Sequence, residues 1–282
     1  MGNPFKIELT GRRIAAFLAR YSSPTVLVLA CLVLWQLGTM LSDIQDWLLP
    51  SPVDVLRAAW GIRGIISPHI WQTAQETLWG FILALVVGLG LGLLIDVSPW
   101  MRDALYPLLV ISQTIPIIAI APLLVIWLGY GIWPKIIVVG LICFFPIVVN
   151  TADGLRGIDR ELVDLLRTMG ANKRAIFIKV RLPGALPAIF SGIKVAITYS
   201  VVGAIMGEWV GGSRGLGIFM LRSTNSFRTD RVFVSVGITA LLSIFLFGLV
   251  VAIERAALRW RYAAVEERWE EIPVLSAPEG GK

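Results

Sequence analysis

The stretch Thr77–Ile95, TLWGFILALVVGLGLGLLI, is nineteen residues long and contains no charged side chain. About 20 consecutive apolar residues let an α-helix cross the hydrocarbon core of a bilayer. The rest of the chain is similar, because 56% of its 282 residues are hydrophobic and 16% are charged, against about a quarter charged in soluble domains. This composition excludes a soluble enzyme, a disordered chain and a secreted disulfide scaffold, and it predicts a polytopic membrane protein.

Six apolar stretches are long enough to cross a membrane, so we predict an all-α fold of six transmembrane helices. The third stretch contains Pro116 and Pro122, which predict a kinked span, since neighbouring helices can satisfy the backbone groups that proline frees. We expect residues 24–265 to form the transmembrane domain, with a long loop at about 151–187 and short terminal segments at 1–23 and 266–282. The predicted spans are Pro24–Leu41, Thr77–Ile95, Leu105–Leu128, Ile132–Val149, Ala185–Trp209 and Val232–Ile253.

The positions of lysine and arginine predict the orientation of these spans. Basic residues gather before the first span, between the fourth and fifth, and after the sixth, and with six spans all three clusters lie on one side. By the positive-inside rule that side is the cytoplasm, and both termini lie there. The outer side would hold Arg57, Arg63, Lys135 and one group that fits the rule poorly. That group is Arg214, Arg222, Arg228 and Arg231.

The loop between the fourth and fifth spans carries a predicted helix outside the membrane. Leu162, Leu165, Leu166 and Met169 follow the i, i+3, i+4, i+7 spacing of one helical face. Asp159 is suited to be the N-cap and Gly170 to end the helix in the left-handed conformation. A second short helix is expected at 172–179, ending before Leu182 and Pro183. Such a helical hairpin could rest on lipid headgroups or dock to a cytoplasmic partner, and both interpretations remain open from physics alone.

The segment from Asp164 to Gly170, followed after nine residues by Val180, Arg181, Leu182 and Pro183, resembles the "EAA" loop of ABC importer permeases. The family pattern is Glu-Ala-Ala, three residues, Gly, nine residues, Ile-x-Leu-Pro, and the spacing here matches it throughout. Asp164 replaces the glutamate, Leu165 and Leu166 replace the alanines, and Val180 replaces the isoleucine, so acidic and apolar character is kept.

This resemblance implies the type I ABC importer permease fold, in which two permease subunits sit on two ATPase subunits. The loop helix would be the coupling helix that enters a groove on each ATPase. An extracytoplasmic substrate-binding protein and a second permease copy are the other implied partners, and no nucleic acid is expected. The implied coupling residues are Asp159, Glu161, Asp164, Leu165, Leu166, Met169, Gly170, Ala171, Leu182 and Pro183.

The chain itself is not expected to be an enzyme. A phosphate-binding loop needs Gly-x4-Gly-Lys-[Ser/Thr], and none of the six lysines has that context. The glycine-rich segment Gly211–Gly217 lacks the lysine and is expected to be a turn. ATP and Mg²⁺ would be used by the separate ATPase, and no cofactor or metal is expected on this chain. Cys31 and Cys143 lie in apolar runs and are expected to be small buried hydrophobic residues.

Polar residues beside prolines at membrane depth suggest helices that bend around a substrate path, although each could instead make a buried interhelical hydrogen bond. The candidate path residues are Gln113, Thr114, Pro116, Asn150 and Glu208. Glu76 and Glu208 are also functional candidates because an acid near an apolar span is costly, and both lie near predicted outer ends. Three glycines of the second span, Gly88, Gly90 and Gly92, are expected to allow close helix approach.

Segments 113–131, 144–150 and 205–211 resemble the branch of sulfonate, taurine and nitrate permeases. Within it, Gln75-Glu76, Asp153-Gly154 and Gly207-Glu208-Trp209 look more like permeases for the thiamine pyrimidine precursor or riboflavin. The alternative substrates are an aliphatic sulfonate, taurine or nitrate, and the alternative class is a non-ABC secondary transporter. An anion buried in the membrane needs a cationic partner. No cation is expected at mid-membrane, because Lys194 lies near the cytoplasmic end of the fifth span. This disfavours an anionic substrate.

Overall fold

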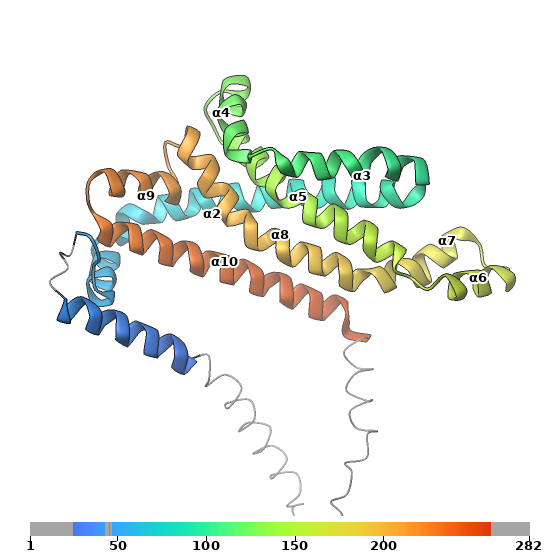
Figure 1. Cartoon of the computed structure of the whole chain (residues 1–282), viewed down its shortest axis with the longest axis horizontal. Helices are drawn as coiled ribbons and strands as arrows, with labels where there is room; N and C mark the ends of the chain where they lie inside the picture. Colours follow the sequence, from blue (N-terminus) through green and yellow to red (C-terminus); the bar gives the residue numbers. More distant parts are fainter. Residues whose placement is uncertain (1–24, 43–44, 46, 261–282) are drawn as a thin grey trace, which may run out of the picture. The chain divides into compact units, whose positions relative to one another are not determined.

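The computed structural model describes residues 25–42, 45 and 47–260, and every regular element within them is helical (Figure 1). An all-helical membrane fold is therefore confirmed. In chain order the described helices are Thr25–Leu41, α2 (Pro52–Val97), α3 (Pro99–Thr114), α4 (Ile117–Leu128), α5 (Trp133–Arg156), α6 (Arg160–Thr168), α7 (Lys173–Ile176), the π-helical segment η1 (Phe177–Arg181), α8 (Leu182–Gly211), α9 (Leu216–Asn225) and α10 (Thr229–Ala257). The predicted terminal segments, 1–23 and 266–282, lie outside the described residues.

Four helices in the described part are long and apolar enough to cross a membrane, namely α2, α5, the run Lys173–Gly211 and α10. Helices α3 and α4 are long and apolar enough only when they are taken together. The apolar helix Thr25–Leu41 is shorter than the 18 residues required of a spanning helix. The number of six spans therefore stays a prediction. The second predicted span, Thr77–Ile95, lies within α2, which is 46 residues long and begins well before it, at Pro52.

The chain divides into two compact units. The first contains the described residues up to Ile65 together with Met220–Val236, and the second contains Ile66–Phe219 and the described residues from Gly237 onward. In the first unit, aromatic pairs join segments that are distant in sequence. The Trp35 and Phe233 rings are 5.3 Å apart, and those of Trp47 and Phe227 are 6.0 Å apart and nearly perpendicular. Such pairs contribute about 0.5–1.5 kcal/mol each beyond area burial.

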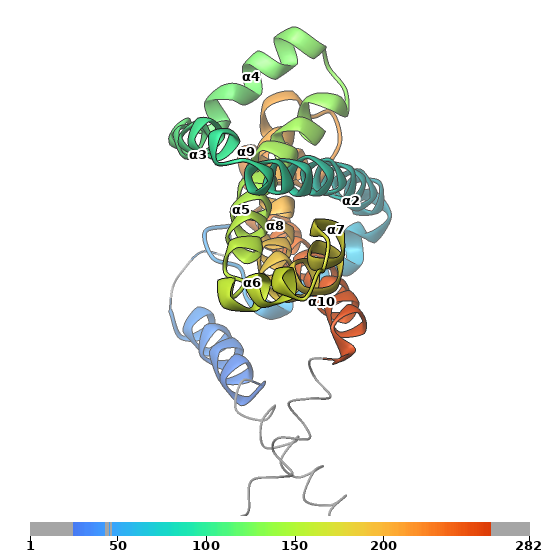
Figure 2. The same ribbon diagram turned by 90° about the vertical axis from the view of Figure 1, so that its right-hand side faces the viewer.

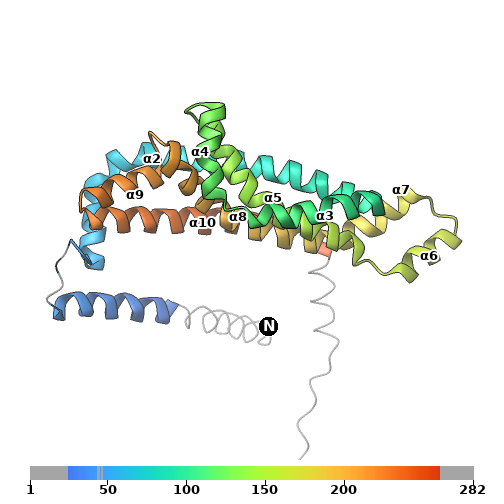
Figure 3. The same cartoon turned by 45° about the horizontal axis from the view of Figure 1, so that its top comes forward.

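The second unit is organised around α5 and α8, which lie side by side (Figures 1 and 3). Glycines of α8 make this close approach possible, because a Cβ on Gly203 would lie 3.2 Å from the Cα of Val139 and one on Gly192 would lie 2.5 Å from the Pro146 carbonyl oxygen. Small residues at a helix interface are typical of membrane proteins, where packing replaces the hydrophobic effect.

Helix α2 packs on α5 through a second set of glycines. A Cβ on Gly88 would lie 2.9 Å from the Ile147 Cβ, and one on Gly92 would lie 2.6 Å from the Thr151 Cβ. The predicted packing role of these two residues is therefore confirmed. The same prediction is wrong for Gly90, which has no atom within 4 Å of its Cβ position, whereas Gly80 packs tightly against Val139.

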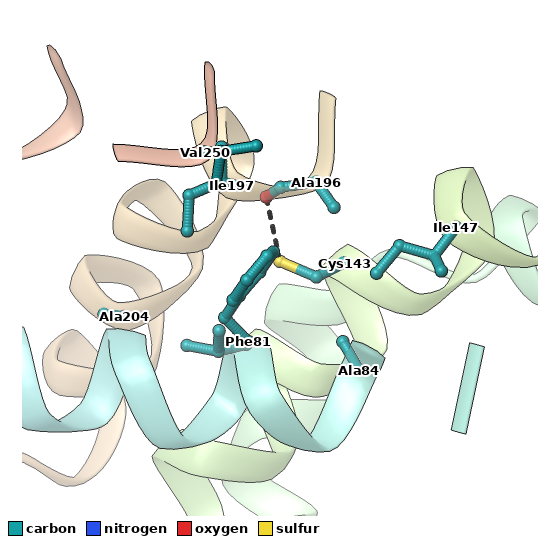
Figure 4. Close-up of a cluster of buried hydrophobic side chains, with 9 residues drawn as sticks. Phe81, Ala84, Cys143, Ile147, Ala196, Ile197, Ala204 and Val250 are labelled. Atoms are coloured by element: carbon teal, nitrogen blue, oxygen red, sulfur yellow. Dashed lines mark hydrogen bonds between the residues drawn. The ribbon is translucent and has the colours of Figure 1, made fainter. Parts of the chain in front are cut away.

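A buried apolar cluster fills the space between α2, α5, α8 and α10 (Figure 4). Its centre includes Phe81, and the Cys143 thiol donates to the Ala196 carbonyl oxygen at 3.2 Å. Cys143 is thus the small buried hydrophobic residue that the sequence predicted. Cys31 is not, because it lies exposed on the helix Thr25–Leu41.

The predicted kink of the third span is a sharp break between α3 and α4, whose axes differ by 95° (Figure 2). Pro116 caps the start of α4, and Ile115 before it is extended, with φ −83° and ψ 120°. A residue that precedes proline is driven out of the helical region by a clash with the proline ring, which explains why the helix breaks here. Pro122 lies inside α4 without breaking it.

The predicted end of a short helix before Leu182 and Pro183 is wrong. Helix α7, η1 and α8 form one continuous run, Lys173–Gly211, of 39 residues. In η1 the backbone makes wide turns, and the Leu182 N–H donates to the Phe177 carbonyl oxygen. Pro183, which has no N–H to donate, follows directly after these wide turns, and the helical run continues through it.

Candidate functional site

Helix α6 protrudes with α7 at one end of α5 and α8 (Figures 1 and 3). Both of its predicted ends are confirmed. The Asp159 carboxylate accepts from the Glu161 N–H at 2.8 Å, and Gly170 has a φ of +85°. The Ala171 N–H donates to the Leu166 carbonyl oxygen, and the Gly170 N–H donates to that of Arg167, both at 3.0 Å. This is the Schellman arrangement, which gives the helix a defined end.

The apolar face of α6 has no covering partner in the described chain. The helix contains no buried residue, and Leu165 and Met169 are 57% and 73% exposed. Leu166 is only half-buried, and Leu162 is exposed as well. An apolar helical stripe on the surface is typical of a helix that enters a groove on another protein. The flanking pair Asp164–Arg167, at 3.0 Å, is itself exposed and contributes little to stability.

The base of this hairpin is fixed by Arg181 of η1. Its guanidinium donates to the Asp96 carboxylate at 2.7 Å and to the Leu155 carbonyl oxygen at 3.0 Å. One side chain thus joins the end of α2, the end of α5 and the start of α8. A charge-assisted contact of this kind is about twice as strong as a neutral one, so the hairpin is anchored firmly to the bundle.

A buried polar network lies at the opposite end of α5 and α8. The Lys135 ammonium of α5 donates to the Glu76 carboxylate of α2 at 2.6 Å, and these side chains are 5% and 0% exposed. Gln72 donates to the same carboxylate oxygen at 2.7 Å. Pairing makes these two buried charges tolerable, because an isolated buried charge is very costly.

Glu208 of α8 completes this network and holds the loop that follows. It accepts from the Thr73 hydroxyl and from the Gly217 N–H, each at 2.5 Å. The loop also bonds back to α2, since the Gly215 N–H donates to the His69 Nδ1 at 3.0 Å and the Leu216 N–H donates to the Thr73 hydroxyl at 2.8 Å. The predicted turn at Gly211–Gly217 is therefore a loop fastened to buried side chains.

Comparison with known proteins identifies the family. The family model described as "Binding-protein-dependent transport system inner membrane component" matches residues 80–259. The chain belongs to these ABC importer permeases. A relative from Halalkalibacterium halodurans, named formylaminopyrimidine transport permease protein ThiX, is 38% identical over 84% of this chain and 95% of its own length. The riboflavin transport system permease protein RibX of Chloroflexus aurantiacus is 37% identical over 83% of this chain and 88% of its own.

Relatives named for other solutes are more distant. Two from Escherichia coli, named for transport of aliphatic sulfonates and of taurine, are 32% and 28% identical. Among solved structures, a chain of the inward-facing MetNI methionine ABC transporter has a TM-score of 0.62 at 21% identity, and the match covers 70% of this chain and 98% of that one. That likeness confirms the permease fold.

The permease is therefore a membrane-embedded translocation subunit without catalytic activity of its own, and a separate ATPase hydrolyses ATP. The alternative class, a non-ABC secondary transporter, is excluded by this membership. The matched region includes the whole α6 hairpin together with Lys135 and Glu208.

The predicted path residues do not form one cluster, and no hydrogen bond joins them to one another in the described part of the permease. Gln113, Thr114 and Pro116 are exposed at the break between α3 and α4. Asn150 belongs to α5 and faces Gly192 of α8, and its side-chain amide donates to the Pro146 carbonyl oxygen at 2.8 Å. Glu208 is fully buried, and both of its oxygens have donors, so its geometry favours a role in holding the loop.

Sequence reasoning missed the residues that pair with the buried acids. Lys135, predicted for the outer side, lies near the start of α5 and is 4% exposed, and its pairing with Glu76 was not predicted. Lys194 lies well inside α8, and its ammonium meets the Glu254 carboxylate of α10 at 2.9 Å. These pairs could have been predicted from charge, because a lysine and a glutamate that both lie in apolar spans are expected to form an ion pair.

Proposed function

We propose that this permease imports a small heterocyclic vitamin or vitamin precursor, with the formylaminopyrimidine related to thiamine, or riboflavin, as the first substrates to test. The observation that carries the proposal is the order of the relatives. Those named for formylaminopyrimidine and riboflavin are 38% and 37% identical, against 32% and 28% for those named for sulfonates and taurine.

The charges of the spanning helices support a neutral substrate over an anion. Lys135 and Lys194 each face a glutamate at hydrogen-bonding distance, so neither offers an uncompensated cation to a sulfonate or nitrate. A buried anion needs such a partner, although helix N-termini can substitute for one. Hydrogen-bonding groups such as Gln113, Thr114 and Asn150 suit the amide and amine edges of a neutral ring.

We propose that α6 is the coupling helix. Its exposed face, centred on Leu165 and Met169, would enter a groove on the ATPase subunit, which supplies ATP and Mg²⁺ chemistry. The fixed base at Arg181 supports this assignment, because a movement of α6 would reach α5 and α8 without being absorbed by a loose joint. An extracytoplasmic binding protein would deliver the substrate to a path between two permease copies.

We further propose that both termini are cytoplasmic, as the three basic clusters predict. Reporters fused to the two termini test this arrangement directly, since they should both be active only in a cytoplasmic assay. A terminal reporter found outside would reject the orientation without touching the substrate assignment.

The deciding experiment on the substrate uses the binding protein that associates with this permease. Formylaminopyrimidine, riboflavin, taurine, an alkanesulfonate and nitrate are titrated separately by calorimetry, and uptake of each ligand that binds is measured with the complete complex in proteoliposomes. Selective binding and uptake of one of the first two is expected. Selective binding of taurine, a sulfonate or nitrate would overturn the substrate assignment while leaving the importer family intact.

A further inference from the structure

A pocket of about 490 Å³ lies inside the hairpin, between α6, α7 and the ends of the spanning helices. It is separate from the apolar face of α6 that we assign to the ATPase. Its wall is strongly cationic, with five basic side chains and one acidic one. These residues are Arg156, Arg160, Arg167, Lys173, Arg181 and Asp164.

Two of the five basic side chains of the pocket form ion pairs with carboxylates of the described chain, and three do not. Arg181 is paired with Asp96, and Arg167 with Asp164. Arg156, Arg160 and Lys173 have no ion-pair partner within the described part of the chain. These three side chains are exposed, so water screens their mutual repulsion, and an anion inside the cavity would relieve the part that remains.

The position of the pocket indicates where such an anion comes from. Val97 ends α2, Arg156 ends α5 and Arg181 immediately precedes α8, and all three line the pocket. With the span arrangement and orientation proposed above, on which this inference rests, the pocket would lie where spanning helices leave the hydrocarbon core, at the depth of the lipid headgroups. Val97, which is exposed, and the half-buried Val163 and Phe177 add an apolar wall beside the charges. A free phosphate ion would gain nothing from that wall, whereas the glycerol and first methylenes of a lipid would.

We propose that this pocket binds the phosphate headgroup of an anionic phospholipid. Basic pockets between transmembrane helices on the cytoplasmic side recognise such headgroups by charge and hydrogen bonding. The bound lipid would join the first turn of α6, the start of α7 and the end of α5, and would thus brace the hairpin against the bundle.

The test compares two double variants that remove the same charge from the same end of the permease. Arg156→Gln/Lys173→Gln changes two cations that line the pocket, and Arg174→Gln/Lys179→Gln changes two exposed cations of α7 and η1 that do not line it. Neither variant alters α6. Native mass spectrometry of the full chain in detergent measures binding of added phosphatidylglycerol and phosphatidylcholine.

The wild-type chain is expected to retain phosphatidylglycerol over phosphatidylcholine. The pocket variant should bind phosphatidylglycerol about tenfold more weakly, since each basic residue near the surface contributes appreciably to anionic-lipid binding. The control variant should stay within about twofold of wild type. Arg156→Lys/Lys173→Arg, which keeps both charges, should restore binding, and this separates charge loss from misfolding.

Two outcomes would overturn the proposal. Equal loss in both double variants would show that binding follows net charge and not the pocket. Displacement of phosphatidylglycerol by inorganic phosphate or glycerol phosphate at equal concentration would show that the lipid is not the preferred source of the phosphate group.

Discussion

The two ends of the α5–α8 pair differ in how far their ion pairs are exposed to solvent. At the hairpin end, Asp164 and Arg167 pair in the open, with side chains that are 67% and 61% exposed. At the other end, Glu76 and Lys135 pair with almost no exposure. The first pair can break and reform in water at little cost, whereas the second cannot separate without leaving a buried charge. The comparison indicates that the exposed pair can rearrange on contact with a partner, whereas the buried pair holds a fixed arrangement.

Breaking the buried pair should have the largest effect. Lys135→Met leaves the Glu76 carboxylate buried without its cation, which is expected to cost about 3–5 kcal/mol. Thermal unfolding of the purified permease should show a large drop in the midpoint, or the variant should fail to accumulate in the membrane. Glu76→Gln/Lys135→Met, which removes both charges, should recover much of the loss. Equal stability of Lys135→Met and wild type would contradict the assignment of a buried pair.

Disturbing the tight packing of α2 against α5 should have the next largest effect on stability. A Cβ on Gly92 would lie 2.6 Å from the Thr151 Cβ, so Gly92→Val must push α2 away from α5. Overpacking of this kind costs about 1–3 kcal/mol. The matched control is Gly90→Val, because Gly90 lies in the same helix with open space around it. Unfolding in detergent should separate the two variants, and identical midpoints would argue against the close approach of these helices.

At the hairpin end, Gly170→Val should damage coupling more than stability. The left-handed turn at Gly170 would be penalised by about 1 kcal/mol or more, and α6 would be tilted relative to its groove. We expect normal amounts of the variant in the membrane together with loss of substrate-driven ATPase activity and uptake in the complete complex. Wild-type uptake by this variant would show that α6 is not the coupling element.

The smallest effect is expected from the exposed pair. Arg167→Gln removes the contact with Asp164, and exposed ion pairs contribute at most about 1 kcal/mol. The unfolding midpoint should stay close to wild type, in contrast to Lys135→Met. A loss as large as that of the buried pair would remove the distinction between the two ends.

The hairpin could be predicted from the sequence because its determinants are local. An N-cap, an apolar stripe and a glycine stop lie within twelve residues, and each acts on its neighbours in the chain. The break at Pro116 was foreseeable for the same reason. The length of α2 was not, because its first part lacks the apolar run that marks a span.

The buried network escaped prediction because its partners are far apart in sequence. Glu76 and Lys135 are separated by 59 positions, and Thr73 and Glu208 by 135. The hydropathy pattern marked Glu76 and Glu208 as costly acids near apolar spans, but it could not identify the residues that pair with them. The prediction from Pro183 failed for another reason. A proline often ends a helix, but here it follows a π-helical segment and the helical run continues through it.

The wide turns of η1 set the rotational phase between the hairpin and α8. An α-helix advances about 100° per residue, so one residue added to or removed from η1 would turn everything beyond it by about that angle. Helix α8 would keep its contacts with α5, and α6 would keep its capped ends. Because α6 is also joined closely to α5, such a change would strain the hairpin and turn its apolar stripe, and it is expected to weaken docking to the ATPase.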